Sequence, residues 1–251
     1  MIEFLGLSKR YGSFEAVQPL TLRIERGEVF GFLGPNGAGK TTTIRMMMGL
    51  LVPSAGAVYI DGLDCHADDA EVKRRIGYLP DNPIFYDYLR GPEILLFVAR
   101  MHGLTPKAAK QETERLIHEF NLEEAGDEYA VNYSLGMKKK LGLACALIHE
   151  PRVLILDEPI NGLDPRAARE VNERLRQYAQ QGTTIFVSTH LLDMAERICS
   201  RVGIIHHGAL VATGTMDELR AATAHDGSLE DLFLGLTDDA TEAPLSLAKV
   251  S

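Results

Sequence analysis

A glycine-rich stretch, GPNGAGKTT at residues 34–42, stands between an apolar run and a segment with helical spacing. Gly34 to Thr41 match the pattern G-x-x-x-x-G-K-[ST], and the preceding VFGFLG is typical of a buried strand. Backbone amides in such a loop turn inward around phosphate oxygens, and glycine is needed because a Cβ would block that approach. The sequence therefore predicts a strand, a phosphate-binding loop and a helix in succession, which is a unit of α/β folds.

Two side chains of the loop indicate what it binds. Lys40 is placed to reach the β- and γ-phosphates, and the Thr41 hydroxyl to bind Mg²⁺. The helix that begins near Lys40 adds its N-terminal amides and its dipole. A glycine-rich turn with a surface lysine is the alternative, but the strand before the loop and the helix after it favour phosphate binding. The predicted ligand is a nucleoside triphosphate with Mg²⁺.

Around this unit the predicted secondary structure of the chain changes twice. The N-terminal part alternates short apolar runs with turns, which indicates strands interrupted by one helix after the loop. Helical spacing dominates an insert at about residues 82–150, where Pro92 and Pro106 occupy first-turn positions. Strands and helices then alternate again. We expect one α/β domain over residues 1–235 and a loose acidic tail over residues 236–251.

Composition excludes several classes of protein. The net charge of -9 argues against a nucleic-acid binder, whose surface is usually basic. No apolar stretch approaches the roughly 18 residues of a membrane span, and the N-terminus lacks the basic-then-apolar order of a secretory signal. Cys65, Cys145 and Cys199 form no CxxC pair, so neither disulfides nor a zinc site is expected. These features predict a cytosolic chain.

A second pattern, RVLILDEP, supplies candidate catalytic groups. Its apolar run predicts a buried parallel strand, and Asp157 and Glu158 follow at the carboxyl end, where open α/β sheets hold ligands. Asp157 suits the Mg²⁺ shell, and Glu158 is placed to orient or deprotonate a water. An acidic helix cap near Pro159 is the alternative. His190 ends another strand-like run, TTIFVSTH, at the same predicted edge.

Five motifs in this order, GPNGAGKTT, SLGMKKKL, VLILDEP, NGLDP and STH, resemble those of the nucleotide-binding subunit of ABC transporters. The resemblance covers roughly residues 1–235. It implies a P-loop NTPase (RecA-like) α/β core with an N-terminal antiparallel β subdomain and an inserted α-helical subdomain. It also implies that ATP is bound and hydrolysed.

The resemblance assigns roles to individual residues. Tyr11 would stack on adenine, although a half-buried strand aromatic is the alternative. Asp157 would hold Mg²⁺, Glu158 would be the catalytic carboxylate, and His190 would contact the γ-phosphate. Residues 161–164 match the loop that crosses the dimer interface. The residues expected around the phosphates are Gly34, Pro35, Asn36, Gly37, Ala38, Gly39, Lys40, Thr41 and Thr42.

The segment YSLGMKKKL carries the quaternary prediction. In the family this signature, usually LSGGQ, contacts the γ-phosphate held by the opposite subunit, so two chains share each ATP head to tail. Ser134 and Gly136 match that signature, whereas Leu135 and Met137 depart from it. This version and SLEDLFLGL near the end resemble the ABC-2-type exporter subgroup. Three lysines follow at 138–140, where they oppose the helix dipole, which indicates a nearby anion or a solvated face.

One position departs from the family in the cleft itself. After the predicted strand RRIGYLP, the family usually has a glutamine that touches the Mg²⁺ or water shell, whereas this chain has Asp81. We expect Asp81 to act on Mg²⁺ through water, because Mg²⁺ favours carboxylates and water. The alternatives are that Asn82 supplies the amide, or that Asp81 only starts a turn before Pro83.

The resemblance also implies partners. These are a second copy or a homologous ATPase subunit, and separate transmembrane permease subunits that hold the chain at the inner face of the cell membrane. The helical insert and the apolar NPIFYDYL are the expected docking surface, unless those aromatics are core. The competing function is a soluble ABC-type ATPase of DNA repair or translation, but neither a long coiled coil nor a second cassette is present. His206 and His207 are predicted to face opposite ways on a strand and to form no metal site.

Overall fold

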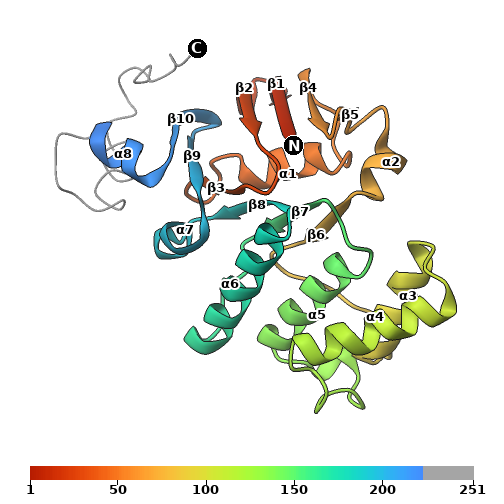
Figure 1. Cartoon of the computed structure of the whole chain (residues 1–251). Coiled ribbons are helices and arrows are strands. Elements are labelled where there is room, and N and C mark those ends of the chain that lie inside the picture. Colours follow the sequence, from red (N-terminus) through yellow and green to blue (C-terminus); the bar gives the residue numbers. More distant parts are fainter. Residues whose placement is uncertain (223–251) are drawn as a thin grey trace.

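The structure, a computed structural model, describes residues 1–222 (Figure 1). The predicted tail at 236–251 and the SLEDLFLGL segment at 228–236 lie outside the described residues.

A six-stranded sheet forms the centre of the described part, in the order β10-β9-β3-β8-β7-β6. All neighbours are parallel except β10, which pairs with β9 in antiparallel fashion. The carboxyl ends of the parallel strands therefore meet at one edge. The strands are β3 (Val29–Leu33), β6 (Ile76–Leu79), β7 (Val153–Asp157), β8 (Thr184–Thr189), β9 (Arg201–His206) and β10 (Ala209–Gly214).

A second, antiparallel sheet of four strands comes from the N-terminal part of the chain, with β3 of the first sheet inserted between β2 and β4, and has the order β2-β1-β4-β5. Its first two strands form a hairpin that ends in the pair between Tyr11 and Phe14. This is the N-terminal antiparallel subdomain of the predicted fold class, which is confirmed. The strands are β1 (Ile2–Tyr11), β2 (Phe14–Ile24), β4 (Ala55–Ile60) and β5 (Leu63–Asp64).

Three longer helices lie between β6 and β7 in the chain and form a separate layer, drawn in yellow and green in Figure 1. Pro92 lies in the first turn of α3, and Pro106 is the first residue of α4 after its N-cap Thr105. A proline is tolerated there because the first N–H groups of a helix have no intrahelical partner. The described helices are α1 (Lys40–Met47), α2 (Asp69–Lys73), α3 (Gly91–Met101), α4 (Pro106–Glu119), α5 (Leu135–Leu147), α6 (Pro165–Gln180), α7 (Leu192–Ile198) and α8 (Met216–Ala222).

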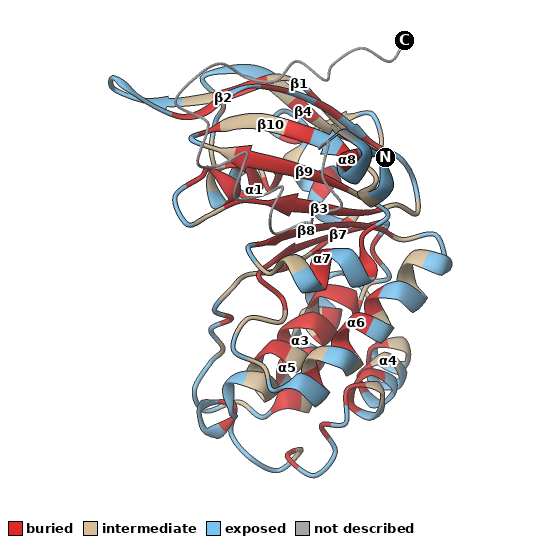
Figure 2. Cartoon of the chain, turned by 90° about the vertical axis from the view of Figure 1, so that its left-hand side faces the viewer, coloured by how far each residue is buried: buried red, intermediate tan, exposed pale blue. Residues whose placement is uncertain are grey.

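The parallel strands are buried on both faces, as the red strands in Figure 2 show. Alternate residues of β7 enter different cores: Val153 and Ile155 pack with the antiparallel sheet and α1, and Leu154 and Leu156 pack with the inserted helices. This explains why β7 is an unbroken apolar run rather than an alternating one. The polar residues at the ends of these strands are thus fixed by two cores.

The N-terminal part contains one helix more than the sequence predicts. After β5, the Asp64 carboxylate accepts hydrogen bonds from the backbone amides of His66 and Ala67, at 2.8 and 3.0 Å. These bonds form a turn that leads into the five-residue α2. Only Val72 of α2 is buried, so the helix carries too little apolar periodicity to be predicted.

Candidate active site

The phosphate loop lies between β3 and α1, as predicted. Two of its glycines have no room for a side chain. Gly39 has φ 112°, in the region that L side chains avoid, and a Cβ there would lie 2.7 Å from the carbonyl oxygen of Ala16. A Cβ on Gly34 would lie 2.4 Å from the carbonyl oxygen of Ile205. The loop is therefore a tight cradle of backbone groups that ends directly at the N-terminus of α1.

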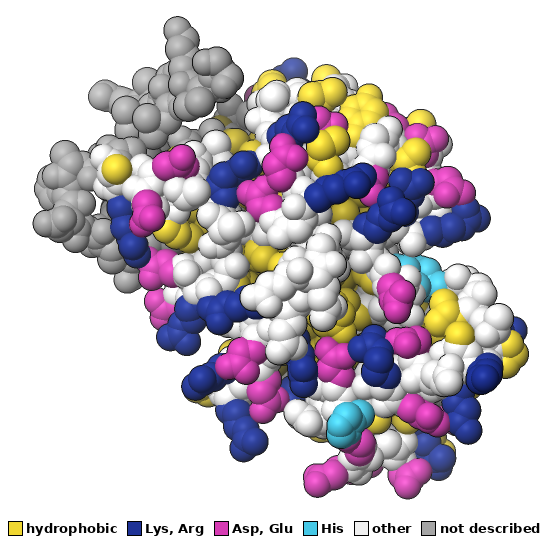
Figure 3. All heavy atoms as spheres, in the orientation of Figure 1, with side chains coloured by type: hydrophobic (Ala, Val, Ile, Leu, Met, Phe, Trp, Pro, Cys, Tyr) yellow, Lys and Arg dark blue, Asp and Glu magenta, His cyan; other side chains and the backbone are white. Residues whose placement is uncertain are grey.

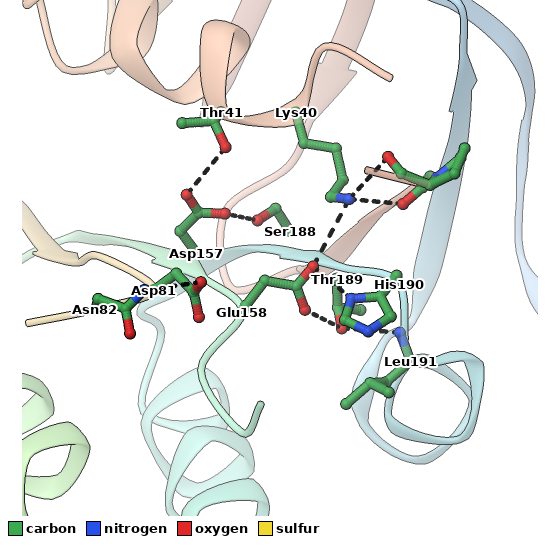
Figure 4. A network of polar contacts seen from close by, with 12 residues as sticks. Lys40, Thr41, Asp81, Asn82, Asp157, Glu158, Ser188, Thr189, His190 and Leu191 are labelled. Atoms are coloured by element: carbon green, nitrogen blue, oxygen red, sulfur yellow. Dashed lines mark hydrogen bonds and ion pairs between the residues drawn. The ribbon is translucent and has the colours of Figure 1, made fainter. Parts of the chain in front are cut away.

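Lys40 is buried at the first position of α1 and points back into this cradle (Figure 4). Its Nζ donates to the carbonyl oxygens of Gly34 at 2.6 Å and Pro35 at 3.2 Å, and lies 3.7 Å from Glu158 Oε1. Burial lowers the pKa of Lys40, while the carboxylates of Glu158 and Asp157 act in the opposite direction. An ammonium held this way can exchange carbonyl oxygens for phosphate oxygens.

Asp157 ends β7 beside the phosphate loop. Its Oδ2 accepts from the Thr41 hydroxyl at 3.3 Å, and its Oδ1 accepts from the Ser188 hydroxyl. Burial raises the pKa of Asp157, and the hydrogen bond from Ser188 opposes that rise. A carboxylate and a hydroxyl are oxygen donors of the kind Mg²⁺ prefers. Thr41 and Asp157 therefore fit the ion that a bound triphosphate would bring.

Glu158 follows in a left-handed backbone conformation, with φ 48°, which is uncommon for a residue other than glycine. Its Oε2 accepts from Thr189 Oγ1 at 3.0 Å, and its Oε1 is hydrogen-bonded to His190 Nδ1 at 2.8 Å. The end of β8 thus brings two side chains onto the end of β7, as Figure 4 shows. The predicted proximity of Glu158, His190 and Lys40 is present in the structure.

Asp81 follows β6 and lines the same cleft as the phosphate loop and both carboxylates. Its Oδ1 lies 3.3 Å from the Nζ of Lys139, and its Oδ2 accepts from Asn82 Nδ2 at 3.4 Å. Lys139 also donates to the backbone carbonyl of Glu158. The contact with Lys139 was not predicted. The role of Asp81 toward Mg²⁺ stays a prediction, and so does the alternative that Asn82 supplies the amide.

Tyr11 lies at the end of the β1–β2 hairpin and also lines the cleft, together with Phe14 and the phosphate loop. Tyr11 is 49% exposed, which fits both base stacking and the alternative of a half-buried strand aromatic, and the Lys9 ammonium lies 5.3 Å from its ring centre. The position is compatible with stacking on a base, which stays a prediction.

The signature segment forms the N-terminus of α5. Ser134 is the N-cap, and its Oγ accepts from the Met137 amide at 3.2 Å. The three lysines that follow have three different partners. Lys138 donates to the carbonyl oxygen of Val131 at 3.3 Å, Lys140 to Glu170 at 2.9 Å, and Lys139 turns inward. A solvated face therefore does not describe Lys139.

The prediction that His206 and His207 face opposite ways is wrong. His206 is the last residue of β9, and the chain turns at His207, whose φ is 46°. Because strand alternation ends there, the two rings meet edge to face with centroids 4.0 Å apart. Residues 1–222 contain no group of three His, Cys, Asp or Glu side chains placed to hold a metal ion.

Comparisons with known proteins agree with this geometry. The profile of the ABC transporter family matches residues 17–161. The Escherichia coli probable multidrug ABC transporter ATP-binding protein YbhF is 37% identical over 95% of this chain, which spans 42% of the length of YbhF. The daunorubicin resistance ATP-binding protein DrrA3 of Streptomyces coeruleorubidus is 40% identical over 88% of this chain and 70% of its own length.

A solved structure of an ATP-binding subunit of an ABC transporter superposes with a TM-score of 0.87. It is 34% identical in sequence, over 94% of this chain and 99% of that one. The predicted resemblance is confirmed by all three comparisons. The chain belongs to the ABC transporter family, among its ATP-binding subunits.

Proposed function

We propose that this chain binds and hydrolyses ATP and thereby drives an ABC exporter, paired with a second copy or a homologous subunit. The observation that carries the proposal is the cleft at the carboxyl edge of the parallel sheet. There a phosphate loop, the oxygen pair of Thr41 and Asp157, and the carboxylate of Glu158 with His190 lie together. This set supplies phosphate binding, a metal position and a proton acceptor in one place.

The proposed roles follow from these contacts. Backbone amides between residues 36 and 42 hold the phosphates, and Lys40 neutralises their charge. Mg²⁺, when bound, would be held by Thr41 and Asp157 and would stabilise the charge that develops on the phosphates. Glu158 accepts the proton of the attacking water. Because His190 Nδ1 is bound to Glu158, its Nε2 is left for the γ-phosphate.

The need for a second ATPase subunit is inferred from the position of Ser134. We propose that the N-terminus of α5, with Ser134 and Gly136, covers the γ-phosphate bound by the other subunit. The loop at residues 161–164 would lie in the same interface. ATP bound between two subunits favours the closed pair only through its greater affinity for that state. Hydrolysis removes the shared γ-phosphate and lets the pair reopen.

The membrane partner would bind an aromatic groove lined by Tyr86, Tyr88 and Phe97. Ile84, Tyr86 and Tyr88 are 92%, 65% and 83% exposed, so the alternative that these side chains are core does not hold for them. Within residues 1–222, no helix has both the length and the apolar character needed to cross a membrane. The family resemblance implies separate permease subunits, and we propose that they place the chain at the inner face of the membrane.

Export, rather than DNA repair or translation, is favoured by the names of the relatives. One is described as a probable multidrug transporter protein and another as a daunorubicin resistance protein. Basic and acidic side chains are interspersed on the face in Figure 3, and the net charge is -9, which does not favour a nucleic-acid partner.

The test of the shared site uses two variants that should each be inactive. Ser134→Arg removes the covering group, and Lys40→Ala removes the phosphate lysine. Mixed together, they should regain one composite site and at most half of the wild-type ATPase rate. Gln111→Arg, on the exposed side of α4, should hydrolyse ATP normally. A fully active Ser134→Arg chain would contradict the shared site, and a wild-type chain without ATPase activity would contradict the proposed function.

A further inference from the structure

Lys139 is a buried cation beside the reacting groups for which the proposed mechanism has no role. It lies in the second turn of α5, with only 1% of its side chain exposed. A lysine is rarely buried without a partner, because desolvation of the ammonium is costly. Its two partners come from two other elements: the carboxylate of Asp81 after β6 and the backbone carbonyl of Glu158 after β7.

The contact with the carbonyl of Glu158 bears directly on the catalytic carboxylate. The left-handed backbone of Glu158 must be held by its surroundings, since this conformation is sparsely populated for such a residue. On one side, the Glu158 amide donates to the Ser188 carbonyl at 3.0 Å. On the other, the Glu158 carbonyl accepts from Lys139 and from the Asn161 amide, the latter at 3.2 Å. Of these three hydrogen bonds to the Glu158 backbone, only the one from Lys139 comes from a side chain.

The contact with Asp81 keeps the ammonium in place. Asp81 is 38% exposed at its side chain and reaches Lys139 from the rim of the cleft. The Lys139 ammonium offsets the charge of Asp81, which lies near the like-charged carboxylates of Asp157 and Glu158. Because Lys139 is almost fully covered, it has no surface with which to touch a nucleotide.

We propose that Lys139 is a positioning residue for the hydrolytic step, and that Asp81 acts through it. Lys139 fixes the peptide of Glu158 and so aims its carboxylate, while Asp81 fixes Lys139. This inference rests on the proposed ATPase function. It assigns to Asp81 a role in the protein that does not need contact with the metal.

The experiment compares four chains: wild type, Lys139→Met, Asp81→Asn and the double variant. Lys139→Met keeps the apolar stem and removes the ammonium. Its kcat should decrease at least tenfold while its KM for ATP stays within about twofold, since a displaced catalytic group costs rate rather than binding. Asp81→Asn should lose about threefold in kcat, because Lys139 keeps the carbonyl of Glu158 as its other partner.

The double variant decides between the two roles of Asp81. If Asp81 acts through Lys139, the double variant should be no slower than Lys139→Met alone. If the kcat of the double variant instead falls by about thirtyfold, the product of the two single losses, Asp81 acts independently of Lys139, as it would on Mg²⁺. That result would overturn the proposal that Asp81 acts through Lys139. Lys110→Met, which removes an exposed lysine 3.8 Å from Glu114, is the matched control and should keep the wild-type kcat.

The experiment also separates failure of this inference from failure of the proposed function. If wild type hydrolyses ATP and Lys139→Met does so within twofold of wild type, the inference fails while the proposed function stands. If wild type does not hydrolyse ATP, the proposed function itself fails. Thermal unfolding without nucleotide identifies a variant that does not fold. In that case Lys139→Gln, whose polar head is one bond too short to reach both partners, is tested instead with the same expected loss of kcat.

Discussion

Replacing Glu158 by glutamine removes a proton acceptor and little else. Glutamine has the same length and shape, so the left-handed backbone at φ 48° and its carbonyl contacts are retained. One of the two side-chain oxygens becomes an amide group, and the contacts with Thr189 and His190 can be kept only in part. The amide cannot take a proton from water at neutral pH.

The expected loss follows from that missing step. A positioned general base contributes about 10²- to 10⁴-fold to a rate, which corresponds to roughly 3 to 5 kcal/mol of activation free energy. ATP binding should persist, because the phosphate loop is unchanged. It should even strengthen slightly, since Lys40 loses a carboxylate 3.7 Å away and keeps its charge for the phosphates.

Two measurements check this prediction. Phosphate release should decrease by at least a hundredfold, and gel filtration with ATP and Mg²⁺ should show a larger dimer peak for the variant than for the wild type. Glu150→Gln is the matched control, because Glu150 is exposed and also left-handed, with φ 52°, but lies away from the cleft. A kcat within threefold of wild type for Glu158→Gln would refute the role of Glu158 as base.

Two further predictions concern stability. Burial, and to a lesser extent the stacked His102, lower the pKa of His149 from 6.5 to about 4, so the unfolded chain binds this proton more readily than the folded one. In urea melts the contribution of His149 should be fully present above pH 6.5 and decrease by at most about 3 kcal/mol as the pH falls from 6.5 to 4, and His149→Gln should lose less stability than wild type over that range. Gly77→Ala should destabilise the fold by about 3 kcal/mol in the same assay, because a Cβ there would lie 2.0 Å from the backbone oxygen of Ala146 and push α5 off β6. An unchanged midpoint would show that α5 can shift at no cost.

The parts of the site that could be predicted depend on local sequence and on one topological rule. The loop from Gly34 to Thr41 is contiguous, so its strand, turn and helix are visible in a single stretch. Asp157 and His190 are 33 positions apart in sequence, but both follow strands. Parallel strands place their carboxyl ends at one edge, so proximity follows without knowledge of the side-chain packing.

Lys139 could not be assigned in this way, because its contacts depend on how α5 sits against the sheet. Its partner Asp81 is 58 positions away. The helix pattern gives no clear signal either. Buried residues lie on most faces of α5, so helical spacing does not distinguish Lys139 from Lys138 and Lys140. A buried lysine requires a partner, but the sequence identifies neither the lysine nor the partner.

Two departures from the family pattern, one in the signature segment and one after β6, involve contacts of α5. Leu135 replaces the first glycine, and its Cδ2 lies 2.6 Å from the point where a Cβ on Gly162 would stand. Gly162, in the loop after Glu158, has φ 75°, a conformation that favours glycine. The nearby Leu135 side chain also leaves no space for a Cβ at this position. Asp81 replaces the usual glutamine and contacts Lys139 one turn further along the same helix. Leu135 lies against that loop and Lys139 binds the carbonyl of Glu158, so we expect a tilt of α5 to move the residues beside the proposed catalytic carboxylate. These two contacts would then couple the helix proposed to cover the partner's ATP to Glu158, which is proposed to act on the ATP of its own chain.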